Sequence, residues 1–106
     1  MHQFVGRWRI KSMELWDQGF VDLVEPAHFR FGTDELGVFV FGAVQGQIDY
    51  CVCDDGARVE YSWAGSDDGD ERSGRGWFRV LSPGLAQGRF FIHCGDESGV
   101  EIEQQV

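Results

Sequence analysis

The sequence predicts an all-β protein in which about eight antiparallel strands close into a small up-and-down barrel. Glycine occupies 15 of 106 positions and proline only two, and turn signals containing glycine recur about every 8 to 12 residues, as in meandering β folds. Between these turns, apolar and polar residues alternate with the period of two that strands require. A two-sheet sandwich is the alternative, because stacking also protects the exposed edges of strands.

The first expected strand runs from about Gln3 to Ser12, and its apolar side chains share one face: Phe4, Trp8 and Ile10. The alternation breaks at Met13, and the segment up to Glu25 is expected to be a short helical turn or a loop that covers one end of the sheet. This segment ends before Pro26, because a residue that precedes proline avoids the α conformation.

The next two expected strands differ in the polarity of their faces. Ala27 to Gly32 alternates cleanly, whereas Leu36 to Val44 contains four consecutive apolar residues, Val38-Phe39-Val40-Phe41. A strand that is apolar on both faces is either covered on both sides or contacts another molecule with its outer face. We therefore expect a homodimer formed through Leu36 to Val44.

The second half of the chain is expected to complete the barrel. Asp54-Asp55-Gly56 predicts one tight turn and Ser82-Pro83-Gly84 another, whereas the like-charged run from Ser66 to Glu71 is expected to be a solvated loop. The strands are expected at residues 47–53, 59–63, 76–82, 85–94 and 100–103.

Length and composition indicate one domain that spans residues 1–106 and has a substantial core. Hydrophobic residues make up 42% of the chain and aromatic residues 14%, which is enough apolar surface to offset the entropy lost on folding. An eight-stranded barrel is either filled by side chains or holds one small ligand. The abundance of Phe and Trp favours the filled form.

The net charge of −9 argues against nucleic acid and anionic membranes as partners, because both would be repelled. A basic protein surface remains compatible with this charge. The N-terminus lacks a basic region followed by an apolar run, and no stretch approaches the ~18 apolar residues of a membrane span. We expect a cytoplasmic protein.

The three cysteines predict neither a disulfide nor a metal site. Cys51 and Cys53 are two positions apart on one strand face, which is poor geometry for a bridge, and Cys94 leaves an odd number. With His93 they have ligand types suited to zinc, but structural sites normally separate paired cysteines by about two to four residues. Reduced thiols without a metal or other cofactor are the favoured interpretation.

The two strands on either side of Ser82-Pro83-Gly84 are expected to form a hairpin over the stretch from Arg72 to Asp96. The densest cluster of potentially reactive side chains lies where its second strand ends. His93 beside Asp96 and Glu97 is the pattern of a general acid/base set, but no motif of a nucleophile accompanies it. His93 and Asp96 are therefore weak catalytic candidates, and a non-catalytic role is favoured. Because neighbouring residues of a strand face opposite sides, His93 and Cys94 are expected to point apart.

Four arginines lie in the same hairpin of an otherwise acidic chain: Arg72, Arg75, Arg79 and Arg89. Guanidinium groups suit carboxylate or phosphate ligands, so Arg75, Arg79 and Arg89, together with His93, are the candidates for binding a small anionic ligand. Internal ion pairs with the run from Asp67 to Glu71 are the alternative, and the sequence favours these pairs.

Two resemblances bear on the family. The triplet Gly6-Arg7-Trp8 is similar to the Gly-x-Trp signature of lipocalins, which implies a lipocalin-like barrel. Over nearly the whole chain, the sequence resembles a family of short bacterial proteins of unknown function. Four segments carry that resemblance: residues 6–10, 13–17, 74–77 and 88–96. It implies no activity, substrate or cofactor.

These observations leave three hypotheses for function. The favoured one is a non-catalytic β-barrel module that binds a small ligand or a protein. The second is an acidic interaction or inhibitor protein that docks on a basic partner through charge complementarity. The third is a small hydrolase-like enzyme that uses His93 and Asp96.

Overall fold

Eight β-strands and one short α-helix follow one another along residues 2–105, the part of the chain that the computed structural model describes. A 3-10 turn at Asp54–Gly56 separates β4 from β5. The elements are β1 (Gly6–Met13), α1 (Gln18–Val21), β2 (His28–Phe31), β3 (Leu36–Phe41), β4 (Val44–Cys53), β5 (Arg58–Asp67), β6 (Asp70–Ser82), β7 (Leu85–Ile92) and β8 (Glu97–Gln104).

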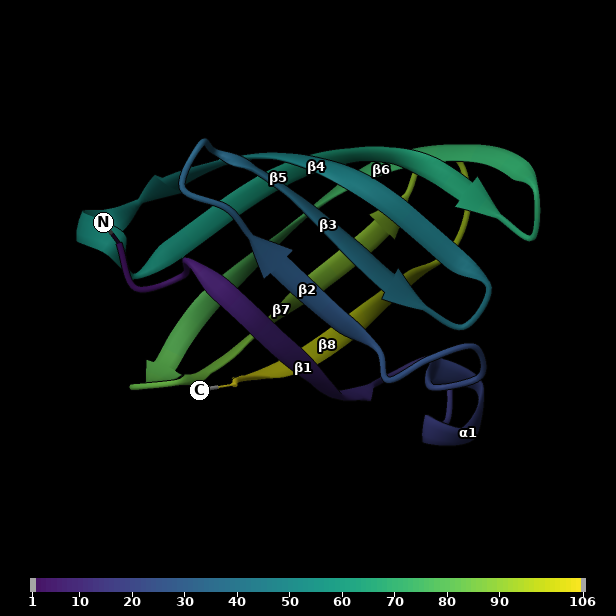
Figure 1. Ribbon diagram of the computed structural model, residues 1–106, viewed down its shortest axis with the longest axis horizontal. Helices are drawn as coiled ribbons and strands as arrows, with labels where there is room; N and C mark the ends of the chain where they lie inside the picture. The colour runs from purple at the N-terminus through teal and green to yellow at the C-terminus, as the bar shows by residue number, and fades with distance from the viewer. Residues whose placement is uncertain (1, 106) are drawn as a thin grey trace.

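The strands form a closed up-and-down barrel, so the predicted fold class is confirmed and the sandwich alternative is wrong (Figure 1). Each strand pairs antiparallel with the next one along the chain. β8 closes the barrel on β1, with Ile10 opposite Ile102. Closure gives every strand two neighbours, which removes the exposed edges of an open sheet.

Aromatic side chains fill the interior of the barrel. Phe29 has no exposed surface, and its ring centroid lies 5.1 Å from that of Phe39 and 4.9 Å from that of Phe78. Such short ring separations leave no room for a ligand among these side chains. The largest fully buried side chains are Trp8, Phe4, Phe29, Phe31, Phe39, Phe41, Phe78, Phe90, Ile10, Ile48, Ile102 and Val21.

The segment between β1 and β2 covers one end of the barrel, as the broken alternation predicted. Asp17 caps α1, its Oδ1 atom accepting the backbone N–H of Phe20 at 2.9 Å. The Trp16 ring packs 5.2 Å from Phe41, and Gly42 donates its N–H to the Val21 carbonyl at 2.7 Å. In Figure 1 the helix lies at the end opposite to the one where β1 begins and β8 ends.

The polar run from Ser66 to Glu71 is not a loop, contrary to the sequence prediction. β5 continues to Asp67 and β6 starts at Asp70, so only Asp68 and Gly69 form the turn. These carboxylates are partly or fully exposed to water. Solvated charges do not oppose the backbone hydrogen bonds of a strand, so the two strands continue through the acidic stretch.

The predicted strand Leu36 to Val44 is two strands in the structure. β3 ends at Phe41, and β4 begins at Val44 after a two-residue turn in which Gly42 has a φ of 54°. Phe39 is buried on the inner face of β3, whereas Val38 is 41% exposed on the outer face. The two apolar faces are confirmed, and a single continuous strand is wrong.

Candidate binding groove on the outer wall

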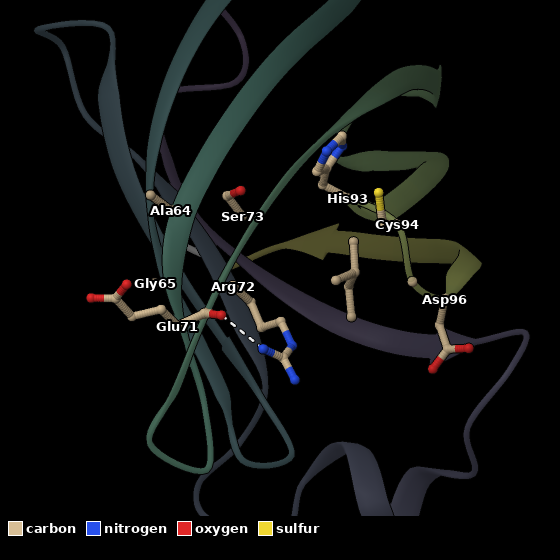
Figure 2. Close-up of a pocket in the computed structure, with 10 residues that line it drawn as sticks. Ala64, Gly65, Glu71, Arg72, Ser73, His93, Cys94 and Asp96 are labelled. Carbon is tan, nitrogen blue, oxygen red and sulfur yellow. Dashed lines mark hydrogen bonds between the residues drawn. The ribbon is translucent and has the colours of Figure 1, made fainter.

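The barrel wall opens between β6 and β7 at the end that carries α1. β7 ends at Ile92, opposite Gly74, so residues 70–73 of β6 extend beyond it. The last bond across this seam is donated by the His93 N–H to the Ser73 carbonyl, at 2.8 Å. Figure 2 shows His93 and Cys94 on the turn after β7, with Arg72 pointing from β6 into the opening. A cleft therefore forms where the two strands separate.

Two adjoining hollows lie at this seam and share Ser73, Ile92, His93 and Cys94. The larger, which we call the end cleft, has a volume of about 890 Å³ and is also lined by Ala64, Gly65, Glu71, Arg72, Gly95 and Asp96. The other, which we call the outer groove, has a volume of about 550 Å³ and is also lined by Ser62, Trp63, Gly74, Arg75 and Phe91.

The outer groove contains no carboxylate, although Asp and Glu outnumber Lys and Arg by 18 to 9 in the chain. Arg75 supplies its positive charge, and its guanidinium carbon lies 4.2 Å over the centre of the Phe91 ring. This stacking holds the guanidinium in place without using its N–H donors. The groove therefore presents fixed donors that suit a carboxylate or a phosphate.

Arg75 differs from most cations of the protein in having no carboxylate close by. Within residues 2–105, six of the nine Lys and Arg side chains lie within 4.0 Å of a carboxylate, whereas Arg7, Arg30 and Arg75 do not. The six paired residues are Arg9, Lys11, Arg58, Arg72, Arg79 and Arg89. The charge of Arg75 is thus available to an external anion.

The other arginine candidates lie apart from the outer groove. Arg79 pairs with Asp54 at 2.8 Å near the opposite end of the barrel. Arg89 bridges Glu14 at 3.2 Å and Glu97 at 3.3 Å. The bonds from the Gly99 backbone and from Arg89 lower the pKa of Glu14 below its usual value. Arg79 and Arg89 thus form internal ion pairs, as predicted. Their partners, however, lie outside the run from Asp67 to Glu71 that the sequence suggested.

Arg72 follows the pairing prediction in part. Its Nη2 atom lies 3.9 Å from Asp70, and its Nη1 atom donates to the Glu71 carbonyl at 2.8 Å, the dashed line in Figure 2. The carbonyl belongs to the stretch of β6 beyond the end of β7. Arg72 therefore provides a hydrogen bond to the Glu71 carbonyl, which has no β7 residue beside it to donate one.

His93 and Asp96 are close in sequence but do not form a catalytic pair in this structure. Both side chains are exposed, and Figure 2 shows the Asp96 carboxylate pointing away from the His93 ring. Among residues 2–105, no hydrogen bond or ion pair joins the two side chains. The prediction that His93 and Cys94 face opposite sides of a strand is wrong, because β7 ends before them and Cys94 adopts a turn conformation with a φ of 57°.

The three cysteines are free thiols in the structure: Cys51 and Cys94 are exposed, and Cys53 is half-buried. Within residues 2–105, no group of three or more His, Cys, Asp and Glu side chains is placed to hold a metal ion. Partial burial and neighbouring carboxylates raise the pKa of Cys53, burial being the larger cause, so this thiol is protonated at neutral pH.

Sequence reasoning missed the two serines that line the outer groove. Ser62, Arg75 and Phe91 lie opposite one another on β5, β6 and β7, and all three point outward. No bond among the described residues engages the hydroxyls of Ser62 and Ser73. Strand parity could have placed each residue on the outer face, but only the register between strands brings them together.

The fold and the groove together define a small filled β-barrel whose outer wall carries a site suited to anions. No protein family matches the chain, and neither a curated protein nor a solved structure is similar enough to count as a match. The resemblances to lipocalins and to short bacterial proteins therefore stay predictions. None of the helices among residues 2–105 has the length and apolar character needed to cross a membrane.

Proposed function

We propose that the protein is a non-catalytic binding module that holds a small anionic ligand, a carboxylate or a phosphate, in the outer groove. The observation that carries this proposal is Arg75, which pairs with no carboxylate among residues 2–105 and lies in a groove without carboxylates. Since aromatic rings fill the interior, a ligand of the barrel has to bind on the outside. Arg75 is the main contact of the anion, and further donors come from Ser73 on the same strand, Ser62 on β5 and His93 on the turn after β7.

The electrostatics of the whole chain favour a small ligand over a large polyanion. A net charge of −9 repels an extended anion at long range, but salt screens this repulsion beyond a Debye length of about 8 Å in physiological buffer. For a small anion, the attraction of the nearby Arg75 guanidinium therefore outweighs the repulsion from distant carboxylates. Hydrogen bonds between charged partners contribute about 1.5 to 3 kcal/mol each, which is enough for weak but selective binding.

A titration with inorganic phosphate and with citrate, followed by amide NMR shifts, tests the site. We expect at least one of these anions to shift the amide signals of Ser73, Gly74 and His93. Replacing Arg75 with Gln (Arg75→Gln) should then weaken binding by about tenfold or more, equivalent to about 1.4 kcal/mol. The variant should keep the fold, because Arg75 is exposed and makes no ion pair among the described residues.

Arg79→Gln is the matched control, because Arg79 lies on the outer face of the same strand but is neutralised by Asp54. It should bind the anion as the unchanged protein does. Equal affinity in Arg75→Gln and the unchanged protein would contradict the proposal, as would signal shifts confined to another surface. A titration in which neither anion shifts any signal would contradict it as well.

We also propose that the protein is cytoplasmic, and its exposed thiols support this proposal. Cys51 and Cys94 are both exposed and unbridged. Exposed free thiols suit a reducing compartment, because an oxidising one would expose them to disulfide exchange.

A further inference from the structure

The outer face of β3 and its neighbours combines an exposed apolar stripe with unpaired charges on either side. Leu36 is 52% exposed and Val38 41% exposed, and Val40 continues the stripe along the same face. These three residues form what we call the β3 stripe. It lies two strands away from the outer groove, so an interface on this face is independent of anion binding.

Positive charge borders the β3 stripe on the side of β2. Arg30 lies directly opposite Val38, and Arg7 of β1 lies directly opposite Arg30. Both arginines are exposed, and neither has a carboxylate within 4.0 Å among residues 2–105. Like charges at directly opposed strand positions destabilise the pair, so these two arginines need a counter-charge that the described part of one copy does not supply.

Negative charge borders the stripe on the side of β4. Asp49 lies directly opposite Leu36, and its exposed carboxylate forms no ion pair among the described residues. Gln47 and Gln45 complete that border, opposite Val38 and Val40. Arg30 on β2, the apolar stripe on β3 and Asp49 on β4 thus follow one another across three adjacent strands. Two further carboxylates lie at the ends of the stripe, Glu25 beside Val40 and Asp34 beside Leu36.

We infer that two copies of the chain associate through the β3 stripe about a two-fold axis that runs along β3. Such an axis exchanges the two borders of the stripe, so the arginine side of one copy faces the Asp49 side of the other. Val38 packs against Val38 of the second copy. Arg30 is then level with Gln47 of the second copy and lies diagonally beside its Asp49, two residues along the strand, so this charge pair forms at two symmetric places. The association buries the aliphatic stripe and supplies the missing counter-charge.

Analytical ultracentrifugation of the unchanged protein tests the association. We expect a concentration-dependent shift from the 12.0 kDa chain to a species of twice that mass. Val38→Asp should give the single chain at every concentration, because it adds one carboxylate from each copy at the centre of the apolar contact, between the two Asp49 carboxylates. Leu81→Asp is the control, since Leu81 is 49% exposed on β6, away from the stripe, and should leave the association unchanged.

Reversing the charges of Arg30 and Asp49 distinguishes this specific association from non-specific hydrophobic association. Arg30→Asp alone and Asp49→Arg alone should each weaken association by about tenfold or more, because each brings like charges together at two symmetric places. The double variant, which carries both Arg30→Asp and Asp49→Arg, should recover the association, because opposite charges again face each other with their positions exchanged. Circular dichroism melting would verify that each variant is folded.

Three results would overturn the inference. The first is a single-chain mass for the unchanged protein at all concentrations. The second is a dimer that persists in folded Val38→Asp. The third is a double charge reversal that associates no better than the single variants, which would show that Arg30 and Asp49 do not face each other.

Discussion

Single glycines permit the close approach of backbones in the wall of the barrel. At Gly88, a Cβ atom would lie 1.7 Å from the carbonyl oxygen of Trp77 on the neighbouring strand. That oxygen belongs to the backbone, so it moves only if the whole strand moves. At Gly99, one strand further on, the nearest atom to an added Cβ is the Cβ of Glu14 at an ordinary 3.5 Å.

Gly88→Ala should therefore be destabilising, whereas Gly99→Ala should be tolerated. Overpacking against backbone costs about 1 to 3 kcal/mol, and a surface substitution in open contact changes stability by about 0.5 kcal/mol or less. The free energy of unfolding, measured in urea for both variants, tests this difference. Equal stability of the two variants would show that the distance between β6 and β7 at Gly88 is larger than the structure indicates.

One carboxylate of the segment around α1, which covers an end of the barrel, makes several bonds that tie this segment to β1 and to the start of β2. Asp22 accepts bonds from the Arg9 guanidinium at 2.7 Å, from Gln18 at 2.9 Å and from the Ala27 N–H at 2.8 Å. The Arg9 bond is the main cause that lowers the pKa of Asp22 from 3.8 to about 2. A helix of one turn has little stability of its own, so its contacts with the barrel, the bonds of Asp22 among them, determine where α1 lies.

Asp22→Asn should lower the free energy of unfolding by about 1 to 2 kcal/mol at pH 7, because it removes the charge-assisted bond from Arg9. A carboxyl whose pKa is lower in the folded state stabilises the fold above its unfolded pKa and loses this effect as the pH falls through its folded pKa. The loss of unfolding free energy in Asp22→Asn should thus be full above pH 4 and become smaller as the pH falls toward 2. Urea unfolding at several pH values measures it.

Asp55→Asn is the control for Asp22→Asn, because Asp55 is exposed in the turn between β4 and β5 and makes no side-chain bond among the described residues. Its unfolding free energy should match that of the unchanged protein. If the loss of unfolding free energy in Asp22→Asn stays constant down to pH 2, the destabilisation does not arise from the charge of Asp22.

The whole barrel depends on a filled aromatic interior. Phe29 contacts rings from several strands, including Phe31, Phe39, Tyr61 and Phe78. Burial strongly raises the pKa of Tyr61, whose hydroxyl has no partner among the described residues, so this phenol stays neutral. The interior thus acts as a structural core.

Phe29→Ala should lower the free energy of unfolding by about 3 to 5 kcal/mol, because it removes a buried ring and leaves a cavity that neighbouring rings cannot fill. Leu81→Ala removes an exposed side chain from the outer wall and should change little. Thermal and urea unfolding of both variants measure the contrast. A small effect of Phe29→Ala would indicate an interior loose enough to hold a ligand.

Local patterns predicted most of the fold. The alternation around Phe29 and Phe31 and the turn at Pro83 and Gly84 depend on neighbouring residues only, so the order of strands, their inner faces and the up-and-down barrel followed from them. The acidic stretch from Ser66 to Glu71 was misjudged, because charge predicts solvent exposure rather than the absence of a strand.

The candidate site was predicted only in part, because it depends on register between distant strands. The sequence singled out Arg75 and His93 but offered no reason to separate them from Arg79 and Arg89. The tertiary structure separates them. Asp54 pairs with Arg79, and Glu14 and Glu97 pair with Arg89. Around Arg75, by contrast, β5 and β6 bring serines and β7 brings Phe91. Polarity and turn formation are properties of neighbouring residues, whereas the partner of a charge is set by how strands far apart in the chain align.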